Sequence, residues 1–116
     1  MNDTCTPVSF GDNLTVFCTC PDDSVAQTLA LALVEKKLAA CVNIINSIKS
    51  VYRWQGEIQQ DTEVLLTIKT TTNGWGKLQQ ALLELHPYDV PEIIALPIVA
   101  GNKDYLSWVG ENVCTD

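Results

Sequence analysis

The sequence predicts an α+β fold of the ferredoxin-like type, in which one antiparallel sheet carries two helices on one face. Two segments have apolar residues at helical spacing, and four segments are rich in β-branched and aromatic residues. They follow one another in the order β-α-β-β-α-β, and a short helical segment comes last. The closely spaced cysteines of an iron–sulfur ferredoxin are absent, so the term describes topology only.

The first strand and helix are predicted from the start of the regular pattern. Residues 14–19 are β-branched and aromatic, and Pro21 ends this strand. Ser24 and Gln27 fit a capping box, which predicts that a helix begins there. Its apolar residues at helical spacing are Ala26, Leu29, Ala30 and Leu33, and two lysines near its end suit the negative end of the helix dipole.

The remaining elements follow a central hairpin. Apolar residues at helical spacing predict a second helix over residues 73–86, and Pro87 and Pro91 bracket a rigid connector after it. A fourth strand is predicted over residues 93–100 and a short terminal helix over residues 103–112.

The central hairpin predicts an oligomer. Residues 42–54 alternate and would extend over ~43 Å as a strand, and residues 57–70 form the returning strand. A compact domain of this size has a diameter of about 35 Å, so part of the hairpin should project, and an isolated ribbon is marginal in water. We expect partner copies to cover it; the alternative is a bulge near Asn46 or Asp61 that folds it back over its own sheet. The large groups at the tip favour the oligomer, namely Tyr52, Arg53, Trp54 and Ile58.

Length, charge and hydropathy limit the possible functions. The 116 residues suit one domain, predicted over residues 14–116, after a flexible polar leader at residues 1–13. The formal net charge is −7 and no basic cluster is present, which argues against nucleic acid and against an acidic membrane surface. No apolar segment approaches the ~20 residues that span a bilayer.

The cysteines predict the compartment. The chain has five, an odd number, and its start lacks the basic flank and apolar run of an export signal. We therefore expect reduced thiols rather than a disulfide framework, and a cytoplasmic protein.

Cys18 and Cys20 are two residues apart at the end of the predicted first strand, so their side chains share one face. Sulfur ligands of this kind suit Cu(I) or Zn. The alternative is that both cysteines pack as small apolar residues in the core.

His86 is the only histidine and precedes Pro87 at the predicted end of the second helix. An imidazole there can cap the free carbonyls of the helix, and a metal ligand or a catalytic base are the other interpretations. No nucleophile can be paired with it from the sequence, so we expect no enzyme activity.

Several motifs resemble the CutA family of divalent-cation tolerance proteins. The similarity extends from Leu14 to Trp108, and the motifs occur in the family's order and spacing. They are KLAACVNI at residues 37–44, SVYRWQG at 50–56, KT at 69–70, HPYDVPE at 86–92 and YLSW at 105–108.

This resemblance implies a cytoplasmic, PII-like homotrimer of ferredoxin-like subunits with a role in tolerance of divalent metal ions, copper above all. The proposed copper ligands of bacterial members are a cysteine on the first strand and two adjacent histidines before the Pro-Tyr. Cys18 matches the cysteine and His86 the second histidine, whereas Leu85 replaces the first. Because Cys20 lies two residues from Cys18, we hypothesise that its thiol compensates for Leu85.

The resemblance also implies a cleft between neighbouring subunits that suits a small polar or anionic ligand. A trimeric PII-like sensor or scaffold is therefore the alternative function. A third possibility, an acylphosphatase-type enzyme, needs an arginine-bearing phosphate loop where this chain has Asp22 and Asp23. The cleft positions are Tyr52, Trp54, Glu63, Lys69, His86, Tyr88 and Glu92.

Overall fold

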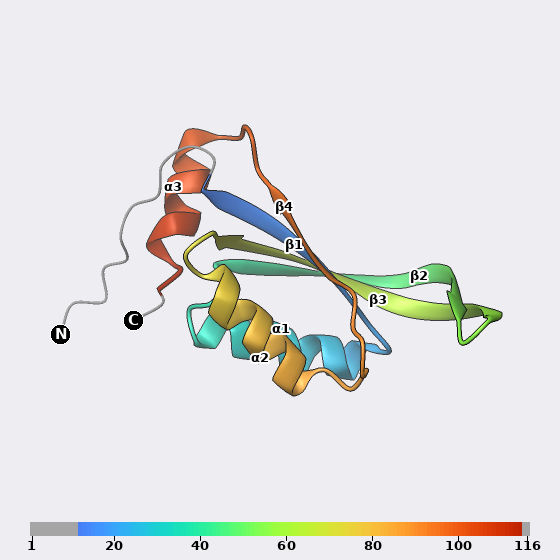
Figure 1. Cartoon of the computed structure of the whole chain (residues 1–116). Coiled ribbons are helices and arrows are strands. Elements are labelled where there is room, and N and C mark those ends of the chain that lie inside the picture. Colours follow the sequence, from blue (N-terminus) through green and yellow to red (C-terminus); the bar gives the residue numbers. More distant parts are fainter. Residues whose placement is uncertain (1–11, 115–116) are drawn as a thin grey trace.

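The computed structural model describes residues 12–114, which form one four-stranded sheet and three helices (Figure 1). The strand order is β2-β3-β1-β4 and every neighbouring pair is antiparallel. This confirms the predicted ferredoxin-like α+β fold. The elements are β1 (Asn13–Cys20), α1 (Asp23–Glu35), β2 (Cys41–Trp54), β3 (Glu57–Thr71), α2 (Trp75–Leu85), β4 (Ile93–Pro97) and α3 (Lys103–Glu111).

The start of β1 and the end of β4 differ from the predicted bounds. Residues 1–11 of the predicted leader lie outside the described residues, whereas Asn13 is buried and pairs with Thr71. Asn13 also donates a side-chain hydrogen bond to the carbonyl of Leu106 in α3. Strand β4 ends at Pro97, three residues early, and a proline has no N–H to continue a ladder.

The predicted capping box of α1 is wrong. Asp22, and not Ser24, is the N-cap: its backbone is extended and its carboxylate accepts a 2.9 Å hydrogen bond from the N–H of Val25. Ser24 lies inside the first turn, where its carbonyl accepts from the hydroxyl of Thr28. An aspartate is as good an N-cap as serine, so two acidic residues beside Ser24 made the starting residue ambiguous from sequence.

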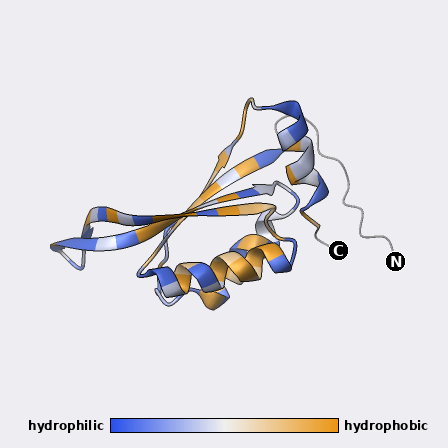
Figure 2. Cartoon of the chain, turned by 180° about the vertical axis from the view of Figure 1, so that it is seen from behind, coloured by the Kyte–Doolittle hydropathy of each residue, from blue (hydrophilic) through white to orange (hydrophobic). Residues whose placement is uncertain are grey.

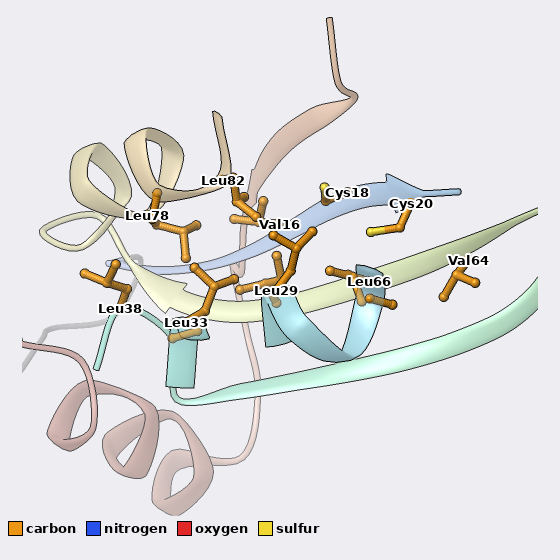
Figure 3. Close-up of a cluster of buried hydrophobic side chains, with 14 residues drawn as sticks. Val16, Cys18, Cys20, Leu29, Leu33, Leu38, Val64, Leu66, Leu78 and Leu82 are labelled. Carbon is orange, nitrogen blue, oxygen red and sulfur yellow. The ribbon is translucent and has the colours of Figure 1, made fainter. Parts of the chain in front are cut away.

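Helices α1 and α2 lie on one face of the sheet and bury the main core against it (Figures 1 and 3). The alternation of β1 and β3 directs one set of side chains to these helices. Figure 3 shows both cysteines of β1 within this cluster. Its fully buried residues include Val16, Cys18, Cys20, Leu29, Leu33, Leu66, Ile68, Leu78 and Leu82.

The β2–β3 hairpin projects from the rest of the domain (Figure 1). A bulge interrupts the register between Ile45 and Ile48, and Ser47 has a positive φ of 63°. The bulge that we considered near Asn46 therefore exists, but the hairpin is not folded back, because pairing continues to the tip and the molecule measures 49 × 30 × 22 Å. At the tip Gln55 and Gly56 both have positive φ, as a tight two-residue hairpin requires.

The second face of the sheet is only partly covered. Helix α3 packs at the end of this face near Asn13, and within the described residues no other helix lies on it (Figure 1). The register places five apolar side chains on the remainder, which we call the open face, and Figure 2 shows that hydrophobic residues continue along these strands. The open face consists of Phe17, Ile45, Leu65, Ile94 and Leu96.

The cysteines are not all free. Cys18, Cys20 and Cys41 are free thiols, whereas Cys114 is disulfide-bonded, so the expectation of reduced thiols is wrong for Cys114. Cys5 lies outside the described residues. Counting cysteines misses such a bond because it depends on two Cα atoms approaching within ~7 Å in the folded chain.

Across residues 12–114, none of the helices combines the length and the apolar character that crossing a bilayer requires.

Candidate functional site

The end of β1 brings two thiols and the imidazole together. Cys18 and Cys20 pair with Leu66 and Val64 of β3 and are completely buried (Figure 3). His86 reaches the same place from the end of α2, and one donor atom from each of the three residues lies within 4.8 Å of the others. The structure therefore places the three predicted metal ligands in one buried group, which we call the Cys–Cys–His cluster.

Both ring nitrogens of His86 are engaged within the protein. Nε2 lies 2.7 Å from the carbonyl oxygen of Thr19, between the two cysteines, and Nδ1 accepts a 3.1 Å hydrogen bond from the backbone N–H of Tyr88. A carbonyl can only accept, so Nε2 carries the proton and Nδ1 is bare. The ring thus caps a carbonyl, but that carbonyl belongs to β1 and not to the end of its own helix, which corrects the capping interpretation.

The chain directs His86 to this position because Pro87 follows it. A residue before proline is disfavoured in helical conformation, and His86 is extended, with φ −77° and ψ 137°. Its N–H still completes the last turn of α2 on the carbonyl of Leu82, at 2.9 Å. The side chain can therefore turn away from the helix axis towards β1.

The two thiols have different acidities. A hydrogen bond between them, followed by burial, raises the pKa of Cys18, and the same hydrogen bond lowers the pKa of Cys20. Negative charge on Glu63 raises both pKa values, and Glu92 adds to the effect on Cys18. The thiolate is the form that binds a metal.

Tyr88 and Glu63 lie beside this cluster. The ring of Tyr88 is tilted by 51° against the imidazole of His86, with centroids 4.7 Å apart, and its hydroxyl donates a 2.7 Å hydrogen bond to the carboxylate of Glu63. Glu63 is only 8 % exposed. These two predicted cleft residues are thus neighbours within one chain.

The other predicted cleft residues are spread over the chain. Tyr52 and Trp54 are exposed on the projecting hairpin, where the hydroxyl of Tyr52 bonds to the carboxylate of Asp61. Lys69 lies six residues from Glu63 along β3, a distance of ~20 Å for an extended strand. Its ammonium donates to the side chains of Asn43 and Thr67, at 2.6 and 3.1 Å. A single chain does not gather these positions into one pocket.

Sequence reasoning missed the group that holds the imidazole. The carbonyl of Thr19 belongs to the backbone, so the type of residue gives no indication of its role. The contacts of Asp61 with Tyr52 and of Asn43 with Lys69 were not predicted either. The only signal for the last two pairs is the strand register, which brings Asp61 diagonally opposite Tyr52 and Asn43 opposite Thr67. That register could not be assigned across the bulge from sequence.

All three tyrosines of the chain are expected to resist ionisation at alkaline pH. Burial and the bond to Glu63 raise the pKa of Tyr88, the bond to Asp61 raises the pKa of Tyr52, and burial raises the pKa of Tyr105. The folded state therefore favours the neutral phenols: this stabilisation is complete below the unfolded pKa of ~10 and is lost as the pH rises through the folded values.

The measurement is a tyrosinate absorbance titration of the native and the urea-unfolded protein. The native curve should lie at higher pH, and Tyr88→Phe should remove one ionising group and weaken the loss of stability above pH ~10. A native tyrosine that ionises at the same pH as in the unfolded chain would contradict the assigned hydrogen bonds.

Known proteins with similar sequences cover most of this chain. The chain is 56% identical over 97 residues to the divalent-cation tolerance protein CutA of Thermus thermophilus, covering 84% of this chain and 94% of that protein. It is 50% identical over 93 residues to protein CutA of Homo sapiens, covering 80% of this chain but 52% of that longer protein.

Solved structures show the same fold. A divalent cation tolerance protein (Cut A1) from Thermus thermophilus superposes with a TM-score of 0.86 at 53% identity, covering 87% of this chain and 98% of that one. CutA1 from Oryza sativa gives a TM-score of 0.87 at 39% identity, covering 99% and 100%. The model of the family described as CutA1 divalent ion tolerance protein matches residues 14–112, and the chain belongs to this family.

Proposed function

We propose that the chain serves divalent-cation tolerance by binding a copper ion at the Cys–Cys–His cluster. The observation that supports this is the approach of three buried donor atoms to within 4.8 Å. Two sulfurs with an imidazole beside them suit copper or zinc, whereas Mg²⁺ and Ca²⁺ prefer oxygen ligands. The carboxylates of Glu63 and Glu92 are close enough to affect the thiols and also favour a cation. Since Leu85 cannot coordinate, Cys20 supplies the additional donor.

Copper retention tests this proposal. Wild-type protein loaded and purified under reducing conditions should keep about one copper ion per chain, and Cys18→Ser combined with His86→Ala should lose it. Cys41→Ser is the matched control, because Cys41 is also a free thiol. Its backbone pairs with Lys69 of β3, and its side chain lies on the face of the sheet away from the cluster. Wild-type protein that retains no copper would contradict the proposal.

We also propose that the working form is a homotrimer. The open face and the projecting hairpin leave large apolar side chains exposed, among them Ile45, Trp54, Ile94 and Leu96. Contiguous apolar surface of this kind marks a contact surface, and partner copies would cover it. Sedimentation velocity of the wild type and of a variant with Ile45→Lys and Ile94→Lys tests this assembly.

A PII-like sensor or scaffold that binds a small polar or anionic ligand between subunits is the second candidate. It is supported by the partly buried Tyr88–Glu63 pair beside the cluster, a polar group of the kind that orients ligands in a pocket. A thermal shift with small anions and none with copper would favour it. Neither candidate requires catalysis, and the engaged ring of His86 has no nitrogen free to act as a base.

The compartment that we propose is the cytoplasm, where a reducing environment keeps Cys18 and Cys20 as thiols. The disulfide at Cys114 is typical of an oxidising compartment instead. The redox state of Cys114 in the cell therefore decides between the cytoplasm and an oxidising compartment.

A further inference from the structure

We propose that the ion held by this cluster is Cu(I), bound by the sulfurs of Cys18 and Cys20 alone, and that His86 is a positioning residue and not a ligand. This inference rests on the proposed function and specifies its ligand set and its ion. It departs from the copper ligands that the sequence resemblance implies, in which His86 coordinates the metal.

The hydrogen bonds of His86 carry the argument. A metal ligand needs a nitrogen lone pair, and the only one in this tautomer, on Nδ1, accepts from the N–H of Tyr88. If Nε2 coordinated the metal, the proton would move to Nδ1. Nδ1 would then be a donor facing the N–H of Tyr88, which is also a donor. The carbonyl of Thr19 would also lose its 2.7 Å partner. Either route sacrifices at least one buried hydrogen bond and leaves a buried polar group unsatisfied, which is unfavourable.

Neither sulfur has to give up a short hydrogen bond to the backbone in order to bind a metal. The contact of Cys18 with the Thr19 carbonyl is long, at 3.8 Å, and both thiols otherwise interact with each other. A metal–sulfur bond of ~2.3 Å allows one ion to bridge sulfurs up to ~4.6 Å apart. This span matches sulfur atoms that lie within 4.8 Å of one another.

The number of available donors selects the ion. Zinc is almost always held by four ligands in a structural site and by three protein ligands in a catalytic one. With His86 held by its two hydrogen bonds, the two sulfurs remain as donors, and the carboxylate of Glu63 already accepts from Tyr88. Soft sulfur ligands favour Cu(I), which two thiolates can satisfy. On loading, each thiol releases its proton to solvent as its sulfur–copper bond forms, and no electron is transferred.

His86 has a separate task in this arrangement. By donating to the Thr19 carbonyl it fixes the backbone between the two ligands, and by accepting from Tyr88 it holds the connector that follows α2 against the end of β1. A residue of this kind resembles the outer partners of metal ligands, whose replacement typically costs ~10–100-fold in affinity.

Competition of Cu(I) with a chromogenic chelator, under anaerobic reducing conditions, is the first experiment. Cys18→Ser and Cys20→Ser should each lower the affinity by more than ~100-fold, beyond the range of outer partners, whereas His86→Gln, whose amide can still donate, should lower it by about 10-fold or less. Cys41→Ser is the matched control and should leave the affinity unchanged. Zn(II) added under the same conditions should not compete.

X-ray absorption of the Cu(I)-loaded wild type is the second experiment, and it reads the ligands directly. Sulfur scatterers without an imidazole contribution are expected, and an imidazole contribution would overturn the inference. So would equal losses in His86→Gln and Cys20→Ser, or zinc binding as tight as copper binding. These outcomes leave the proposed copper function intact, whereas absence of Cu(I) binding to the wild type would remove both.

Discussion

Replacing Leu66 by alanine is expected to lower the free energy of unfolding by ~2–5 kcal/mol, the usual cost of removing a fully buried leucine side chain. Leu66 lies in the middle of β3, opposite Cys18 on one side and Ile44 on the other, and is completely buried beneath the helices. Its neighbours belong to the paired strands and to the helices that cover them, so the cavity left behind closes only in part. Urea unfolding followed by circular dichroism measures the difference.

Leu31→Ala is the matched control for this substitution. Leu31 lies on the outer face of α1 and is 67 % exposed, so the same chemical change there should alter stability by no more than ~0.5 kcal/mol. Both variants must be compared at equal chain concentration, because the stability of the proposed homotrimer would depend on it. Similar losses at the two positions would show that the core is not where the structure places it.

Placing lysines on the open face is expected to convert the assembled protein to single chains. Ile45 and Ile94 are 45 % and 46 % exposed, so a single chain tolerates Ile45→Lys with Ile94→Lys by extending the charged ends into water. In an assembly that covers this face, the same lysines would be buried without partners, which costs several kcal/mol per charge. Sedimentation velocity should show a wild-type particle of three times the 12.7 kDa chain mass and a double variant at the chain mass.

Leu31→Lys controls for the added charge, because it changes an exposed leucine on the opposite side of the molecule. It should sediment as the wild type does. A double variant that stays assembled would show that the open face is not the contact surface. Wild-type protein that sediments as a single chain at micromolar concentration would remove the homotrimer altogether.

The order and type of the elements could be predicted from the sequence because they follow from local periodicity. Apolar residues at Leu29 and Leu33 repeat with the period of a helix, and the alternation around Leu66 and Ile68 has the period of a strand. The ends of the elements were predicted less accurately, because adjacent residues compete for the same capping hydrogen bond. The shift of the N-cap from Ser24 to Asp22 is an example.

The candidate site was predicted only as a set of residues. Family motifs singled out Cys18 and His86, and spacing alone suggested Cys20. The relation among them depends on a hydrogen bond between residues 67 positions apart, His86 and Thr19, and on the Tyr88 N–H that fixes the tautomer. No pattern in the sequence records which nitrogen of an imidazole carries the proton.

The ferredoxin-like order of elements, the excess length of the central hairpin and membership of the CutA1 family all follow from the amino-acid sequence. These properties are carried by repeats and motifs that can be read along the chain. Three further properties are seen only in the folded chain: the hairpin projects despite its bulge, Cys114 is disulfide-bonded and His86 has no free nitrogen. Each of these depends on which distant atoms come within bonding distance, and that is fixed only when the helices and the sheet pack together.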